Sequence, residues 1–548
     1  MILGLSDFIT LRNGGTYVDK TDIIDELAPL LQSSTSIIMN RPRRFGKSLM
    51  VSMLEAFFSD ELDSKMYFEG LKIAASNNYS LLNQFPVIKL SFKNASTAEP
   101  SSMIRAIKMM LSEVYDHFAT RLLHICDDRE RAYFQSIISI NADDTEYSHC
   151  LDVLSSLIYR ATNKKPIILI DEYDAPIEAS YGSSSYHEVL TFLKALFIAT
   201  FKDTPSYGFG FITGVFGIAK GTLGTGLNNI PVDSGPNSPL KKNYFGFTQE
   251  EVRQLCKANN ISEEDCDRLE SYYGGYRFLG ESFYNPWSIL NYLSTRSLFA
   301  FWGNSGSNKA FSKVVDVAFS YDAELITCLL DDGVETQLDF TASYEDIDSS
   351  PEHILLYLIL AGYLTLNQIS FNKYYVFLPN QECKAAFADE IVSRYHDKAG
   401  ARKIMRLKKA LYQGDGQELV SFFSDFLLSS LSYYDFSDEK NYQIMVGTIA
   451  ALLFDECIVK HEVIAGTGRC DIMISPLKEH AFGAVIEIKF VNARTSIQRL
   501  QGRAQTALNQ IKKHLYAKEL FVRNANPIMA YGFAFFKNNI AVKEEKLR

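Results

Sequence analysis

The sequence lacks closely spaced cysteines, internal repeats and low-complexity tracts. Its eight cysteines are spread singly along 548 residues, without a Cys-x-x-Cys pair. This spacing excludes the usual structural zinc motifs and a disulfide framework, and it is typical of reduced thiols in the cytoplasm. We therefore expect a cytoplasmic protein without a zinc site.

Long apolar runs are also missing. The longest, Ile354–Leu366, is shorter than a bilayer requires and predicts a buried helix. The N-terminal residues Met1–Asp7 lack the basic start and the long apolar region of a signal peptide. The sequence therefore gives no sign of a membrane partner.

Length and composition predict several globular domains. A chain of 548 residues is too long for one ordinary core, and its 47% hydrophobic and 22% charged residues are typical of folded proteins. We expect four segments: a first domain over residues 1–235, a helical extension of it over 236–300, a mixed middle segment over 301–445 and a last domain over 446–548.

A basic turn between an apolar strand and a helix is the most informative feature of the chain. Ser36–Asn40 predict the strand, Arg41–Ser48 form the turn, and a helical pattern continues from Leu49. Backbone N–H groups at such a helix start face an anion, Lys47 adds a positive charge, and the Ser48 hydroxyl can bind Mg²⁺. The turn therefore predicts a site for the phosphates of a nucleotide.

The turn departs from the phosphate-loop pattern G-x-x-x-x-G-K-[ST] at one position. Arg41 stands where the pattern has its first glycine. A glycine there normally gives the loop a conformation that is closed to other residues. A basic N-cap on an ordinary helix is the alternative interpretation.

Two further apolar runs end in polar residues that fit such a site. Pro166–Ile170 is followed by Asp171 and Glu172, as expected of a strand buried on both faces of a parallel sheet. Because ligands of open α/β sheets bind at this end of the strands, Asp171 is the candidate to hold the Mg²⁺ that Ser48 contacts. Glu172 is the candidate to polarise an attacking water. Thr213, near the end of the third apolar run, Gly208–Gly214, could sense a γ-phosphate or simply terminate a core strand.

A series of ordered motifs resembles the AAA-ATPase-like family, whose ATPase region is commonly joined to a C-terminal PD-(D/E)XK nuclease-superfamily domain. The motifs run through nearly the whole chain: Tyr17–Thr21, Arg41–Ser48, Ile170–Pro176, Thr213–Val215, Leu227–Asn229, Phe245–Thr248, Tyr273–Phe278, Tyr284–Ser288, Gly362–Thr365 and Pro379–Asn380. An arginine expected after Val215 is missing, and Arg277 is a possible second charge sensor.

The resemblance implies an α/β fold. It implies an N-terminal P-loop NTPase-like parallel sheet with helices, a helical middle segment and a C-terminal restriction-endonuclease-like α/β domain. It also implies ATP and Mg²⁺ as cofactors, with the following residues at the nucleotide: Arg44, Gly46, Lys47, Ser48, Asp171 and Thr213.

A second constellation lies near the C-terminus. Gly468–Asp471 begin a predicted strand that runs through Ile474, and fifteen residues separate Asp471 from Glu487 in the strand Ala484–Phe490. Because side chains alternate along a strand, Glu487 and Lys489 share one face. If the strands pair, the two carboxylates converge on one hard cation such as Mg²⁺, and Lys489 can orient a water or stabilise charge. Charges on a solvated strand face are the alternative interpretation.

The resemblance implies that this constellation is the PD-(D/E)XK core. Glu462 matches an additional acidic metal ligand on the preceding helix, and Gln510 and Tyr516 match a Gln-x-x-x-x-x-Tyr feature on the following one. That following helix is expected over Ser496–Lys518. Its apolar stripe is Leu500, Ala504, Ala507, Leu508, Ile511 and Leu515.

Charge is unevenly distributed along the chain. The formal net charge is −10, yet residues 451–548 hold 15 Lys and Arg against 9 Asp and Glu. A basic region on an acidic body predicts binding of nucleic acid phosphates there, DNA being the first choice. Unless they form only a solvated helix face, the expected contacts are Arg494, Arg499, Arg503, Lys512 and Lys513.

The leading hypothesis is a protein with two enzymatic sites. An N-terminal ATPase, with Glu172 as a catalytic residue, would govern a Mg²⁺-dependent nuclease that uses Asp471, Glu487 and Lys489. The alternative is a nucleotide-switched interaction protein whose nuclease-like domain binds nucleic acid or a partner without cleavage. Nucleotide binding for stability alone is a third reading. A homo-oligomer is compatible with the resemblance.

Overall fold

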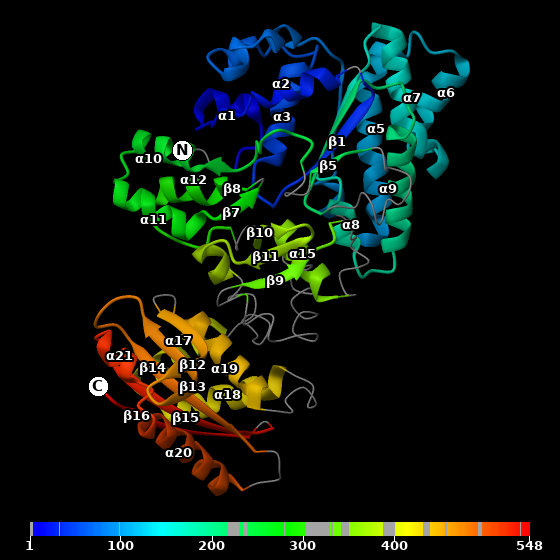
Figure 1. Cartoon of the computed structure of the whole chain (residues 1–548). Helices are drawn as coiled ribbons and strands as arrows, with labels where there is room; N and C mark the ends of the chain where they lie inside the picture. Colours follow the sequence, from blue (N-terminus) through cyan, green and yellow to red (C-terminus); the bar gives the residue numbers. More distant parts are fainter. Residues whose placement is uncertain are drawn as a thin grey trace. The chain divides into compact units, whose positions relative to one another are not determined.

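The computed structural model describes residues 4–31, 33–97, 99–216, 230–233, 238–278, 280–302, 329, 333–340, 350–386, 400–430, 439–454, 457–491, 496–537 and 539–548. The chain divides into two compact units (Figure 1). The first contains Met1–Ser305 and Glu335–Tyr375, and the second contains Gly306–Val334 and Val376–Arg548. The stretch 301–445, expected as one middle segment, is thus shared between the two units.

A five-stranded parallel sheet forms the centre of the first unit. Its strands, in the order in which they neighbour one another, are β2 (Val87–Ser91), β3 (Ile167–Asp171), β4 (Phe209–Gly214), β1 (Thr35–Asn40) and β5 (Val232–Asp233). Every residue of β3 and β4 is buried, as expected of strands covered on both faces. This order places β4 between β1, which leads into the predicted phosphate loop Arg41–Ser48, and β3, which ends at Asp171.

Helices cover both faces of this sheet. Figure 1 shows α3 on one side and α5, α7 and α9 on the other. The helices of this unit are α1 (Phe8–Gly14), α2 (Ile23–Leu27), α3 (Lys47–Phe58), α4 (Lys65–Phe68), α5 (Met103–Leu122), α6 (Asp128–Ile138), α7 (Asp144–Thr162), α8 (Ala175–Ser180), α9 (Tyr186–Phe201), α10 (Gln249–Ala258), α11 (Glu263–Tyr273), α12 (Pro286–Thr295) and α15 (Pro351–Ala361).

The apolar run Ile354–Leu366 is only partly helical. Helix α15 ends at Ala361, because Gly362 takes a left-handed conformation with φ +92°. Strand β10 begins three residues later, at Thr365. In the described part of the chain, no helix is long and apolar enough to cross a membrane.

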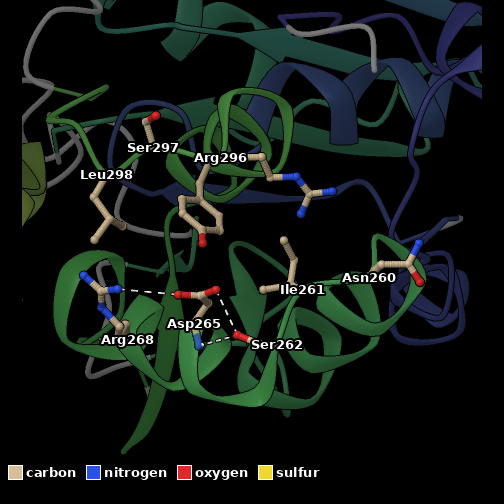
Figure 2. A pocket seen from close by; sticks show the side chains of 9 residues that line it. Asn260, Ile261, Ser262, Asp265, Arg268, Arg296, Ser297 and Leu298 are labelled. Carbon is tan, nitrogen blue, oxygen red and sulfur yellow. Dashed lines mark hydrogen bonds and ion pairs between the residues drawn. The ribbon is translucent and has the colours of Figure 1, made fainter.

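Two small sheets complete the first unit, except that Val334 of β9 and residues 376–377 of β11 fall in the second. One has the order β6 (Phe247–Thr248), β8 (Glu281–Tyr284), β7 (Tyr276–Phe278), and the other has the order β10 (Thr365–Ser370), β11 (Lys373–Phe377), β9 (Val334–Gln337). A cavity of about 500 Å³ lies between α11 and the end of α12 (Figure 2). Asp265 there pairs with Arg268 and accepts a hydrogen bond from the Ser262 hydroxyl.

The second unit is built on a mixed five-stranded sheet. Its strands are β12 (Cys457–Ala465), β13 (Gly468–Pro476), β14 (Gly483–Phe490), β15 (Ile528–Phe536) and β16 (Asn539–Lys546), in that order. Only the β14–β15 pair is parallel. One face packs against α17 (Gly400–Gln413), α18 (Gly416–Ser430) and α19 (Glu439–Leu453), and the other against α20 (Ile497–Lys513) and α21 (Lys518–Val522) (Figure 1). The expected α/β fold class is confirmed for both units.

The predicted stripe of α20 is buried with one exception. Leu500, Ala504, Ala507, Leu508 and Ile511 all lie in the core. Leu515 is 59% exposed, because α20 ends at Lys513 and Leu515 has φ +55° in the turn that follows. The prediction was wrong for this residue, since it extended the helix through a turn.

Candidate nucleotide-binding and nuclease sites

The phosphate loop joins β1 to α3, as the pattern predicts. Lys47 is the first residue of α3, and Gly46 precedes it with φ +91° and no side-chain cap on the helix. A Cβ at Gly46 would meet no atom within 4 Å. The uncapped N-terminus of a twelve-residue helix therefore faces open space, which is the arrangement that binds an anion.

Arg41 explains why this loop needs no first glycine. Its backbone has no positive φ; among loop residues the left-handed positions are Arg44, with φ +68°, and Gly46. The guanidinium of Arg41 is fully buried and pairs with both oxygens of Asp233 in β5, at 2.6 and 2.8 Å. It also donates to Asn243 at 3.0 Å. A buried ion pair thus anchors the loop at the position where the pattern has a glycine.

Lys47 lies among the carboxylates that follow β3. Its Nζ donates to the carbonyls of Arg41 and Pro42, at 2.8 and 2.9 Å. Burial lowers the pKa of Lys47, and the charges of Glu172, Asp174 and Asp171 act against that shift. The charges of these three carboxylates therefore act on Lys47.

The ends of β3 and β4 bring Thr213 and Asp171 together. Thr213 in β4 is fully buried and donates to Asp171 Oδ1 at 2.8 Å. Glu172 is half-buried with φ +54°, and burial together with the Asp171 charge raises its pKa. Ser48 is half-buried as the second residue of α3. Arg44 is exposed, with its guanidinium 4.6 Å from the centre of the Trp287 ring.

Asp174 is a residue of this site that the sequence reasoning missed. Its buried Oδ2 accepts the N–H groups of Val215 and Phe216, at 2.9 and 2.7 Å. Burial raises the pKa of Asp174 to about 6. The carboxylate thus ties the end of β3 to the turn after β4. Its position three residues after Asp171, within the same motif, was the available signal. Arg277, the possible second sensor, is exposed on β7.

In the second unit, the acid pair lies where two strands separate. The antiparallel ladder of β13 and β14 ends at the pair Ile472–Ile486. One step beyond, Asp471 Oδ2 accepts the N–H of Ile488 at 2.6 Å. Lys489 Nζ donates to Glu487 Oε1 at 2.9 Å. Asp471, Glu487 and Lys489 therefore meet at one end of the sheet.

The electrostatics of this end favour a cation. Glu487 is 1% exposed, and burial followed by the nearby Asp471 charge raises its pKa to about 7. Burial also raises the pKa of Asp471. Oε2 of Glu487 is buried without a hydrogen-bond partner. Two carboxylates with an unsatisfied oxygen are the donor set that Mg²⁺ accepts, so the residues present fit this ion.

The predicted position of the third acid, Glu462, was wrong. Glu462 lies in strand β12, not on a helix, and it is half-exposed in an ion pair with Arg469. The preceding helix is α19, which begins at Glu439. Glu439 Oε2 accepts the N–H of Phe490 at 2.8 Å, and its other oxygen lies 4.0 Å from Lys489 Nζ. An acid at the start of an amphipathic helix was the signal that sequence reasoning passed over.

Metal ligands are not gathered in a ready-made cage. Across the described ranges, no group of three or more His, Cys, Asp or Glu side chains is close enough to hold a metal ion. A Mg²⁺ site at Asp471 and Glu487 would therefore take its other ligands from water and substrate, as this ion commonly does.

The expected nucleic acid contacts lie mostly on the exposed side of α20. Arg499, Arg503 and Lys513 are exposed there, whereas Lys512 pairs with Glu545 at 3.0 Å. Arg494 falls outside the described residues. On the same helix Gln510 donates to the Tyr516 hydroxyl at 3.4 Å, so both residues of the Gln–Tyr feature are used within the fold.

Comparison with known families confirms the resemblance drawn from the motifs. The family model described as Predicted AAA-ATPase matches residues 2–224, and that of the PD-(D/E)XK nuclease superfamily matches residues 437–545. The chain is also 25% identical over 571 residues to an uncharacterized protein in the vnfD 5' region of Azotobacter chroococcum mcd 1, covering 98% of this chain and 97% of that protein. The chain therefore combines an AAA-ATPase-like region with a PD-(D/E)XK nuclease-like region.

Proposed function

We propose that the chain binds and hydrolyses ATP with Mg²⁺ in its first unit and cleaves phosphodiester bonds of nucleic acid, DNA in the first instance, in its second. One observation carries the nuclease proposal: Asp471, Glu487 and Lys489 meet at one end of the sheet, with one Glu487 oxygen buried and unpartnered. A buried carboxylate oxygen is costly unless a donor or a cation completes it.

The residues of the second unit would divide the work. Asp471 and Glu487 supply oxygen ligands. Mg²⁺, when bound, lowers the pKa of a coordinated water and neutralises charge on the phosphate. Lys489, kept protonated by Glu487 and Asp471, offsets negative charge that develops in the transition state. Glu439 fixes the end of β14 through its bond to the Phe490 N–H.

At the phosphate loop, Lys47 exchanges the carbonyls of Arg41 and Pro42 for phosphate oxygens. The N–H groups at the start of α3 hold the same phosphates. Asp171, which accepts a hydrogen bond from the Thr213 hydroxyl, would hold Mg²⁺, and Glu172 would orient the attacking water.

A plasmid-nicking assay with Mg²⁺ or Mn²⁺ tests the nuclease. We expect Glu487→Gln to slow cleavage about 100-fold or more, because an oxygen ligand and its charge are lost. Glu462→Gln is the matched control, an acid of the same sheet outside the site. Equal cleavage by wild type and Glu487→Gln removes the assignment. No cleavage by wild type together with DNA binding supports the interaction protein instead.

Titration with a fluorescent ATP analogue tests the phosphate loop. We expect Lys47→Ala to weaken binding strongly, whereas Lys89→Ala, an exposed lysine on β2 of the same sheet, leaves it unchanged. Unchanged affinity of Lys47→Ala discards the nucleotide site. ATP turnover, with and without DNA, then separates hydrolysis from binding alone.

A further inference from the structure

Both tryptophans of the chain contact the phosphate loop. Trp302 is 5% exposed and donates its Nε1–H to the Arg43 carbonyl at 3.3 Å. The ring of Trp287 lies 4.6 Å from the guanidinium of Arg44. The sequence contains two tryptophans, and these are the two. Indole emission therefore reports directly on this loop.

The turn after α15 packs against the same loop. A Cβ added at Gly362 would lie 2.7 Å from the Cβ of Pro42, closer than two carbon atoms can approach. Tyr363 meets Trp302 edge to face, with ring centres 4.6 Å apart. Gly362 thus lies against Pro42, and Trp302 is hydrogen-bonded to Arg43.

A second set of contacts leads from the phosphate loop through β7 to β10. Phe45, 1% exposed, packs edge to face on Tyr276 and Phe278 of β7, at 4.9 and 5.7 Å. Strand β7 is joined to β10 by the N–H of Arg277, which donates to the Thr365 hydroxyl at 2.8 Å. Two separate packed routes therefore connect the phosphate loop to β10.

Strand β10 belongs to the small sheet through which the chain changes units. The boundary between the two units falls inside β9, after Val334, and inside β11, after Tyr375. Both strands are members of the β10–β11–β9 sheet. The sheet that contains β10 therefore also contains the two points at which the chain passes from one unit to the other.

We propose that Trp302 and Gly362 are positioning residues of the phosphate loop, and that nucleotide binding acts through them on the β10–β11–β9 sheet. The inference rests on the nucleotide binding proposed above and adds its route toward the nuclease-like unit. Closely packed contacts transmit small displacements because they have few voids to absorb them. Lys47 must leave the carbonyls of Arg41 and Pro42 to reach a phosphate, and Pro42 is the residue that Gly362 touches.

The test uses the full chain and ADP with Mg²⁺ as the probe. Binding is measured by calorimetry, the environment of Trp302 by emission of Trp287→Phe, and the sheet by hydrogen exchange of peptides covering residues 365–377. We expect ADP to change the Trp302 emission and to slow exchange in these peptides. In Gly362→Ala we expect binding about tenfold weaker and, at saturating ADP, no slowing of exchange.

Gly70→Ala is the matched control. Gly70 also has a left-handed backbone, with φ +75°, but a Cβ there meets no atom within 4 Å. It therefore carries the same backbone strain without touching the loop, and its exchange response should equal that of wild type. Trp302→Phe, which keeps the ring packing and removes the N–H donor, should reduce the response.

The outcomes separate the two proposals. Failure of wild type to bind ADP overturns the nucleotide site and this inference with it. Binding without any change in Trp302 emission or in exchange of residues 365–377 overturns the coupling alone. An exchange response in Gly362→Ala equal to that of wild type and Gly70→Ala overturns it as well.

Discussion

Arg41 illustrates, at the scale of one residue, how a loop pattern can change while its geometry is kept. Four of the interactions of its guanidinium are made inside the protein: two to Asp233, one to Asn243 and one to the carbonyl of Asn40. The rings of Phe245 and Phe278 lie over the same group, at 5.4 and 5.0 Å. The loop is therefore held by side-chain contacts where other loops use backbone freedom.

Breaking this pair should be costly. We expect Asp233→Asn to lower the free energy of unfolding of the first unit by about 3–5 kcal/mol, because it leaves a buried guanidinium uncompensated. The double variant Arg41→Met with Asp233→Leu should recover much of the loss. Urea unfolding followed by tryptophan emission measures this unit alone, since both tryptophans lie in it.

An exposed ion pair of the same unit is the control. Glu55→Gln breaks the pair with Lys89 and should cost less than about 1 kcal/mol, because water and salt already screen it. A similar cost for both variants would contradict a structural role of the Arg41–Asp233 pair.

Asp174 predicts a pH dependence of stability. Burial raises its folded pKa to about 6, above the ordinary value of 3.8, so the folded state binds this proton more tightly than the unfolded state. Its contribution to stability therefore falls as pH rises from about 4 to about 6. Asp174→Asn keeps an oxygen for the Val215 and Phe216 N–H groups and cannot ionise. As the pH rises from 4.5 to 7, we expect the urea midpoint of Asp174→Asn to increase relative to that of wild type.

Exposed Asp63 provides the comparison for this titration. Asp63→Asn controls for the loss of one negative charge at an exposed position. If the profile of Asp174→Asn runs parallel to that of wild type, its carboxylate is not the source of the pH dependence.

At the scale of the element, α20 shows how closely a helix can lie on a sheet. A Cβ at Gly532 of β15 would lie 2.1 Å from the Ala504 carbonyl oxygen and 2.5 Å from the Leu508 nitrogen. Gly532 is directly opposite Glu487 in the parallel β14–β15 pair. The small residue thus sets the depth of α20 beside the candidate catalytic glutamate.

Two glycine variants test this packing. We expect Gly532→Ala to destabilise the second unit by about 1–3 kcal/mol, because the backbone of α20 must move away. Gly502→Ala, on the open side of the same helix, should stabilise it by about 1 kcal/mol, because alanine is the better helix former. Calorimetric unfolding measures both. Gly532→Ala with wild-type stability would mean that the helix does not lie this close.

At the scale of the whole molecule, charge is divided along the chain. Residues 451–548 carry an excess of Lys and Arg within a protein of net charge −10. Part of that excess is on the exposed side of α20, at Arg499 and Arg503. Nucleic acid binding, if electrostatic, should therefore depend on salt through these residues.

The salt dependence of DNA binding tests this division. We expect Glu487→Gln in Mg²⁺-free buffer to bind duplex DNA with an affinity that falls as salt rises. Adding Arg499→Ala and Arg503→Ala should reduce the log–log slope by about 2, one unit per lost phosphate contact. Arg129→Ala, an exposed arginine of α6, should leave the slope unchanged. An unchanged slope in the α20 variant places the contacts elsewhere.

The sequence by itself determined the two-region composition and the fold class. Local signals sufficed for these: an apolar strand, a basic turn and a helix around Lys47, buried strands ending at Asp171 and Thr213, and alternation that puts Glu487 and Lys489 on one face. The stripe of α20 was readable for the same reason, because helical periodicity is local.

Only the tertiary structure decided which distant residues complete each site. The partner of Arg41 lies 192 residues away, and the turn that holds Pro42 lies more than 300 residues further along the chain. Glu439 contacts the end of β14 because α19 begins there, while β12 places Glu462 in an ion pair with Arg469. Such pairings depend on how strands order and helices pack, and no local pattern contains that information.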